Sequence, residues 1–94
     1  MATYFMFGKY SATAIKGISA ARTKEALEAV EKLDGKVKSI HALLGEHDLV
    51  IIADFPKLQD AMKASLALHR LTNISFSTSP AIPVEEFDKI VTEA

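Results

Sequence analysis

The stretch Leu49-Val50-Ile51-Ile52-Ala53 is apolar at every position, and Tyr4-Phe5-Met6-Phe7 repeats this pattern near the start of the chain. A strand with one face in water alternates apolar and polar residues, whereas an unbroken apolar run is typical of a strand covered on both faces. The rest of the 94-residue chain offers only two long amphipathic helices, which can cover one face of a sheet. The two runs therefore predict a sheet protein that associates with itself.

Patterns on either side of these runs supply the other elements. Apolar residues at helical spacing indicate helices, and alternating residues indicate strands. Gly35 suits the left-handed backbone position that often ends a helix. Gly45-Glu46 suits a two-residue type II′ hairpin turn, which sets Leu44 opposite His47. We expect strands at residues 3–10, 36–44, 47–54 and 74–82, and helices from about residue 20 to 33, from 56 to 72 and from 84 onward.

This order of elements, strand-helix-strand-strand-helix-strand, is typical of a ferredoxin-like α+β sandwich. We expect one domain over residues 1–94, an antiparallel four-stranded sheet in the order 4132, and a short C-terminal helix. In that sheet the first and third strands are central, which agrees with their unbroken apolar runs. The fourth strand alternates with serine and is limited by Pro80 and Pro83, as suits an edge strand.

Composition argues against several kinds of function. The eleven Lys and Arg are scattered among twelve Asp and Glu, for a net charge of −1, so no basic surface is expected to hold a nucleic acid. The absence of cysteine removes disulfides, thiolate zinc sites and cysteine nucleophiles, and it suits the reducing cytoplasm. No segment approaches the ~20 apolar residues of a membrane span. We expect a cytoplasmic protein without a nucleic-acid or membrane partner.

Short segments spread over nearly the whole chain resemble the GYD-domain family. They are Tyr4-Phe5-Met6, Gly8-Lys9-Tyr10-Ser11, Lys16-Gly17-Ile18, Gly45-Glu46-His47-Asp48, Asp54-Phe55-Pro56, and Phe76-Ser77-Thr78 with Pro80. The resemblance implies a dimeric α+β barrel and brings no established biochemical activity. The naming motif of the family is a glycine, one variable residue, then tyrosine and aspartate. Gly45 and Asp48 match it, whereas His47 stands in the place of the tyrosine.

The expected hairpin sorts its residues onto two faces of the sheet. The face toward the helices takes Ile40, Ala42, Leu44, His47, Leu49, Ile51 and Ala53, and the other takes Ser39, His41, Leu43, Asp48, Val50 and Ile52. On the second face His41 lies diagonally across from Asp48, within side-chain reach. A small-molecule pocket needs an apolar floor with a few polar groups. The second face has such a floor and such groups if two further groups of residues lie on it. These are Tyr4, Met6 and Tyr10 of the first strand, and Ser75, Ser77 and Ser79 of the fourth.

Several polar residues have two interpretations. Lys16-Gly17 either faces an anion at the start of the following helix or forms a mobile connection. Arg22, in the first turn of that helix, either faces an anion or pairs with Glu25. His41 and Asp48 form either a general acid-base pair or a polar contact beside a turn. The candidate ligand-binding residues are Tyr4, Tyr10, Lys16, His41, Asp48 and Ser77.

Three classes of function fit these patterns. The histidines lack the spacing of metal ligands, and the serine run lacks the glycine-framed elbow of a hydrolase, so we expect no metal and no cofactor. We prefer a homo-oligomeric, non-enzymatic module that binds a small ligand or another protein. The alternative is a cofactor-independent enzyme of isomerase or monooxygenase type, and the third class is a purely structural assembly. The enzyme would use His41, Asp48, Tyr4 and Tyr10.

We expect at least a homodimer, joined through the sheet face away from the helices. Val50 and Ile52 lie on that face, and Met6 joins them if the first strand has the matching parity. Removing apolar area from water favours association by ~25 cal/mol per Å². The C-terminal helix, with Phe87 and Ile90 aligned, either clasps the partner or caps its own sheet.

Overall fold

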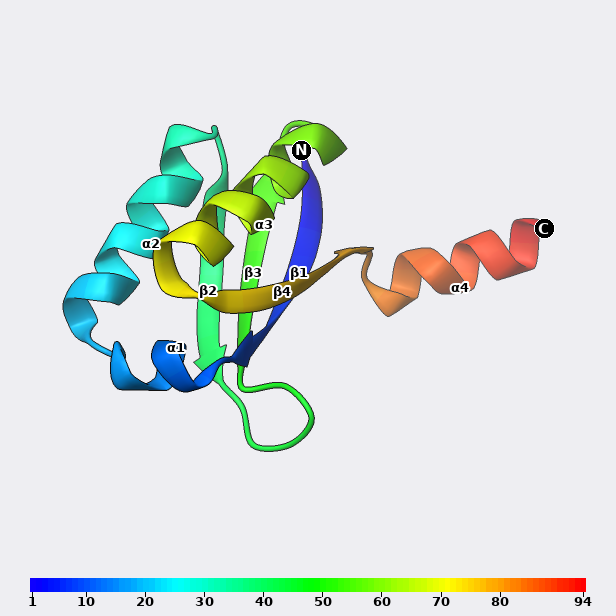
Figure 1. Cartoon of the computed structure of the whole chain (residues 1–94). Coiled ribbons are helices and arrows are strands. Elements are labelled where there is room, and N and C mark those ends of the chain that lie inside the picture. Colours follow the sequence, from blue (N-terminus) through cyan, green and yellow to red (C-terminus); the bar gives the residue numbers. More distant parts are fainter.

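The computed structural model describes all 94 residues and has two layers, a sheet and a pair of long helices on one of its faces (Figure 1). The sheet is antiparallel and its strands lie in the order β2-β3-β1-β4, which confirms the expected 4132 order read from the other edge. The short helix α1 was not expected. The elements are β1 (Ala2–Tyr10), α1 (Ala12–Lys16), α2 (Ala20–Lys32), β2 (Lys36–Ala42), β3 (Leu49–Phe55), α3 (Leu58–Thr72), β4 (Ile74–Ala81) and α4 (Val84–Glu93).

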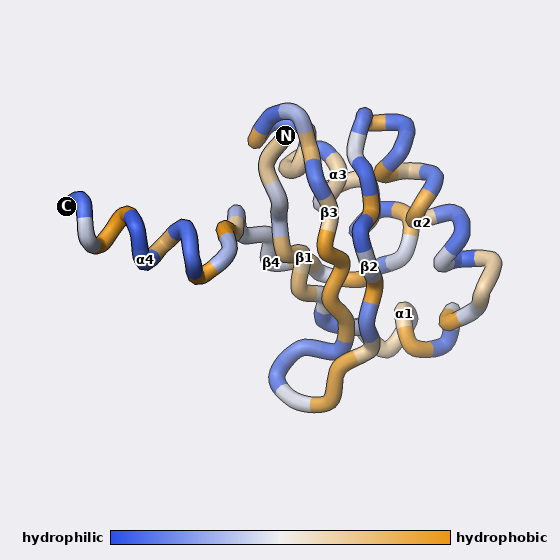
Figure 2. Tube along the Cα trace, turned by 180° about the vertical axis from the view of Figure 1, so that it is seen from behind, coloured by the Kyte–Doolittle hydropathy of each residue, from blue (hydrophilic) through white to orange (hydrophobic).

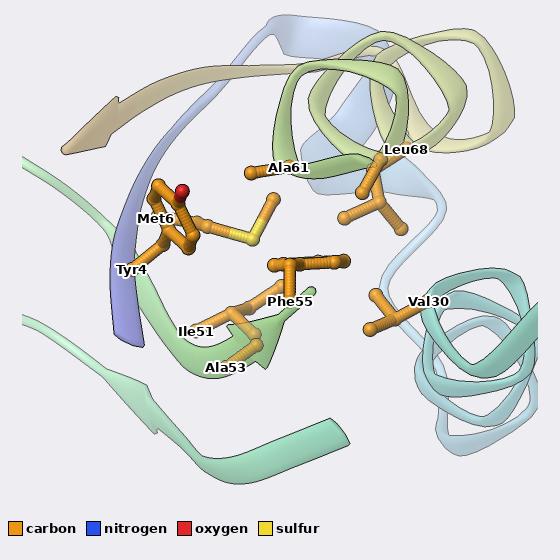
Figure 3. Packing of buried hydrophobic residues seen from close by; sticks show 9 residues of the cluster. Tyr4, Met6, Val30, Ile51, Ala53, Phe55, Ala61 and Leu68 are labelled. Atoms are coloured by element: carbon orange, nitrogen blue, oxygen red, sulfur yellow. The ribbon is translucent and has the colours of Figure 1, made fainter. Parts of the chain in front are cut away.

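The core lies between the sheet and the helices α2 and α3 (Figure 3). Phe55 at the end of β3 is completely buried, and its ring meets the Tyr4 ring edge-on at 5.9 Å between centroids. Small residues on α3 let that helix lie close to the sheet. The buried cluster consists of Tyr4, Met6, Val30, Ile51, Ala53, Phe55, Ala61, Ala64 and Leu68.

The parity assumed for the first strand is wrong, whereas the parity assumed for the fourth is right. Met6 pairs with Ile51 and shares its side of the sheet, so Tyr4, Met6 and Tyr10 face the helices. The ladder between β1 and β3 fixes this, because paired residues point to the same face. The other face, here called the open face, is formed at its centre by Phe5, Phe7, Val50 and Ile52, with Ser75, Ser77 and Ser79 along β4.

The connection between β2 and β3 is not a two-residue turn. The register is the expected one, with Ile40 opposite Ile51 and Ala42 opposite Leu49, but the ladder ends there and residues 43–48 form a longer loop. Asp48 donates its backbone N–H to the Gly8 carbonyl at 2.9 Å, which draws the loop end toward β1.

This loop moves His47 to the opposite face from the one expected. Its ring stacks on Phe7 at 5.0 Å between centroids, and Phe7 belongs to the open face. Leu44, its expected cross-strand partner on the helix side, is fully exposed.

Gly35 does not occupy a left-handed position at the end of α2. Asp34 takes that backbone conformation, with φ of 62°. Gly35 is instead constrained by space, since a Cβ there would lie 2.5 Å from the Phe55 ring and 2.7 Å from Val30.

The helix α4 stands apart from the two layers and does not cap its own sheet (Figure 2). None of its residues is buried. No helix of the chain combines the length and the apolar character needed to cross a membrane.

Candidate ligand pocket

The six residues expected to bind a ligand do not form one cluster. Tyr4 is buried in the core, and Tyr10 lies on the helix side at the end of β1. His41 and Ser77 are exposed on the open face, opposite Val50 and Phe7, and Lys16 is exposed at the end of α1. The single pocket expected on the His41 face is therefore not assembled within one chain, and the ligand-binding role of each residue stays a prediction.

The Asp48 side chain bonds to the end of β1 and not to His41. Its carboxylate accepts a hydrogen bond from the Tyr10 backbone N–H at 2.9 Å, and no hydrogen bond joins it to the His41 ring. This bond joins Asp48 to the end of β1 and not to the β2–β3 connection, so both interpretations of the pair stay predictions. No group of three histidine, aspartate or glutamate side chains is placed to hold a metal ion.

A pocket opens on the helix side of the sheet, at the end where β1 leaves it. It has a volume of about 50 Å³ and is lined by residues from both long helices and all four strands. A buried water needs roughly 10–15 Å³, so the enclosed space holds only a small apolar group, and the rest of a bound molecule would lie in the open mouth. Eight of its eleven lining residues are apolar. They are Tyr10, Arg22, Thr23, Ala26, Ile40, Leu49, Ile51, Leu68, Thr72, Ile74 and Phe76.

Arg22 is the one charged residue of this pocket. Ser19 caps α2 by accepting a hydrogen bond from the Arg22 backbone N–H at 3.0 Å, which fixes the arginine in the first helical turn. The Arg22 Nη1 donates to the Ala14 carbonyl at 2.5 Å, and the guanidinium lies 5.9 Å from the centroid of the Tyr10 ring.

No carboxylate forms an ion pair with Arg22, and the expected alternative pairing with Glu25 is absent. A guanidinium has five N–H donors. Its other donors stay available to an acceptor at the mouth of the pocket. Sequence patterns placed Arg22 in the first turn of a helix but did not place it beside Tyr10, because the short helix α1 and its turn bring the two together.

Opposite this pocket, the open face carries a polar cluster of Thr3, Lys38 and Asp54. The pKa of the Asp54 carboxyl is lowered, first because the Thr3 hydroxyl donates a hydrogen bond to it and also because the Lys38 ammonium lies 3.6 Å away; burial opposes this shift. A groove of about 280 Å³ lies beside the cluster, with Phe5 and Ile52 in its wall. This cluster has no counterpart in the sequence predictions.

Comparison with known proteins agrees with the fold. The family model described as the GYD domain matches residues 4–91. No curated protein matches the sequence. A solved structure with a similar fold is the crystal structure of the leucine response regulatory protein (LrpA) of Mycobacterium tuberculosis, with a TM-score of 0.58 and 11% sequence identity. The match covers 87% of this chain and 51% of that one, so this chain spans about half the length of the relative.

Proposed function

The chain belongs to the GYD domain family, and we propose that it is a ligand-binding module whose pocket takes a compact apolar molecule carrying an anionic group. The observation that supports this most directly is Arg22, a half-buried cation without a carboxylate partner at the mouth of an apolar pocket. Apolar walls with one or two fixed polar groups are typical of small-molecule sites. The guanidinium would hold the anion, and the walls would select an apolar body.

The chemistry of arginine favours this proposal. Charge-assisted hydrogen bonds from arginine are about twice as strong as neutral ones, so a single guanidinium can fix the orientation of a carboxylate or a similar anion. The structural relative is named for a response to leucine, a small molecule with an apolar side chain and a carboxylate. At 11% identity this likeness shows only the fold, and the ligand class rests on the pocket.

We further propose that the module is a homo-oligomer joined through its open face. Phe5, Phe7 and Ile52 form a half-buried apolar area there, which the chain's own helices do not cover, whereas Val50 on the same face is already buried within the chain. Closed two-fold pairing is the commonest way to cover such an area. The Arg22 pocket lies on the other side of the sheet, so pairing would leave its mouth open.

The enzyme alternative is not carried further. It required His41, Asp48, Tyr4 and Tyr10 in one site, whereas the structure divides these residues between two faces of the sheet. The carboxylate of Asp48 is already bonded to backbone.

The ligand proposal is tested with benzoate as the probe and benzamide as its neutral counterpart. Titration followed by amide chemical shifts should show saturable benzoate binding that moves the signals of Tyr10, Arg22 and Ala26. Arg22→Met should weaken it by roughly tenfold to a hundredfold, because a hydrogen bond to a charged group contributes about 1.5–3 kcal/mol.

Lys24→Met is the matched control, since Lys24 is an exposed cation on the same helix. It should leave benzoate binding unchanged. The proposal is overturned if benzamide binds as tightly as benzoate, or if both methionine variants lose the same affinity.

A further inference from the structure

The helix α4 is amphipathic and has no partner within its own chain. Its apolar residues Val84, Phe87, Ile90 and Val91 are 69%, 54%, 52% and 59% exposed. No hydrogen bond or ion pair joins it to anything before Pro83. An isolated helix shorter than about 12–15 residues is marginal in water, and α4 has ten. Packing on a surface would therefore stabilise its helical state.

A second unpartnered apolar stripe runs along the outside of α3. Leu58, Met62 and Leu66 follow one another at four-residue spacing and are 54%, 58% and 58% exposed. The buried side of α3 uses other positions, namely Ala61, Ala64 and Leu68. The outer stripe is thus not part of the core, although its composition is that of a packed helix face.

The two stripes match in length. At 1.5 Å per residue, the stripe of α4 from Val84 to Val91 spans about 10 Å and that of α3 from Leu58 to Leu66 spans about 12 Å.

Their flanks are opposite in charge. At 3.6 residues per turn, the charged residues beside the apolar stripe of α4 are Glu86 and Asp88. Those beside the stripe of α3 are Lys63 and Arg70. Opposite charges beside an apolar contact select the partner and its orientation.

We propose that α4 packs along the outer α3 stripe of a second copy of this chain. In this structure α4 points away from its own α3 (Figure 1), so it does not cover the α3 stripe of its own chain. The α3 stripe lies on the opposite side of the sheet from the open face, so the contact is separate from pairing through that face. Used together, the two contacts build an assembly larger than a dimer.

The absence of cysteine allows a direct test by cross-linking. Full-length chains carrying Ile90→Cys are mixed with mass-tagged chains carrying Met62→Cys and treated with a short bismaleimide. The expected product joins one chain of each kind. Lys89→Cys is the matched control, because it turns its side chain to the polar flank of α4, and it should give several-fold less product.

Two results would overturn the proposal. One is an equal yield from the two α4 positions, which would mean random collision. The other concerns a double variant with Met62→Cys and Ile90→Cys in the same chain, tested beside the mixture. If it cross-links only within single chains, α4 folds back on its own α3.

A second measurement uses the mass of the assembly. Phe87→Asp should raise the concentration of half-dissociation at least about tenfold, as loss of a central aromatic anchor does. Thr92→Asp, an exposed polar position on α4, should leave it unchanged. An unchanged assembly for Phe87→Asp contradicts the proposal. Benzoate binding to Arg22 should be the same in both variants, so failure of this contact is distinguished from failure of the ligand pocket.

Discussion

Gly35 is restricted by its neighbours rather than by its backbone. Phe55 and Val30, which a Cβ would contact, are essentially fully buried and cannot move aside. Gly35→Ala should therefore lower the free energy of unfolding by about 1–3 kcal/mol, the usual cost of overpacking.

Asp34→Gly is the matched control for this substitution, because Asp34 holds the left-handed conformation that glycine adopts without strain. The free energy of unfolding of the Asp34→Gly variant, measured in urea, should equal or exceed that of the parent chain. Equal stabilities of Gly35→Ala and the parent chain would contradict the packing argument.

Thr3 sets the titration of Asp54 on the open face. Because the folded-state pKa of this carboxyl is lowered, its contribution to stability is complete above the unfolded pKa of about 4 and is lost as pH falls through the folded pKa. Thr3→Val removes the hydroxyl donor, so the pKa of Asp54 should rise and acid destabilisation should begin at a higher pH.

Carbon NMR of the Asp54 carboxyl measures this shift directly. Lys38→Met should raise the pKa less, because the hydrogen bond from Thr3 is the larger cause and the Lys38 side chain is half exposed. A larger effect of Lys38→Met would reverse this assignment.

At the scale of elements, the sequence predicts the ladder but not the loop. The pairing of Ile40 with Ile51 follows from a hairpin centred on Gly45-Glu46, and it holds although residues 43–48 form a longer loop than a two-residue turn. The loop is shaped by the bond from Asp48 to Gly8, a contact between distant strands that no local spacing reveals. The Arg22 pocket was not predicted because its lining comes from six elements, which local spacing does not bring together.

His47 tests the loop. Its ring stacks on Phe7, and its Nδ1 is buried without a hydrogen-bond partner. His47→Tyr keeps an aromatic ring on Phe7 and removes that unpaired nitrogen, so the free energy of unfolding should hold or rise by up to about 1 kcal/mol. Thermal melts of His47→Tyr beside His47→Ala, which should be less stable, check this. Loss of folding in the tyrosine variant would show that the stacked arrangement is wrong.

At the scale of the molecule, two apolar strands at the centre of the sheet predicted that something must cover both of its faces. The structure assigns one face to α2 and α3 and leaves Phe5, Phe7, Val50 and Ile52 on the other. The sequence patterns predicted a second apolar face, but they placed Met6 on it and not Phe5 and Phe7. An unbroken apolar run carries no alternation, so parity had to come from the ladder.

Association through that face is the prediction at this scale. Even a few hundred Å² of apolar area removed from water favours pairing by several kcal/mol before the entropy of association is subtracted, at ~25 cal/mol per Å². Ile52→Asp places a charge in the centre of the face, and light scattering over a dilution series should show dissociation at a concentration at least about tenfold higher than for the parent chain. Lys24→Asp, on the helix side of the sheet, should leave the concentration of dissociation unchanged. A parent chain that stays monomeric at high micromolar concentration would mean that the open face needs no partner, and that the apolar centre of the sheet tolerates water on one side.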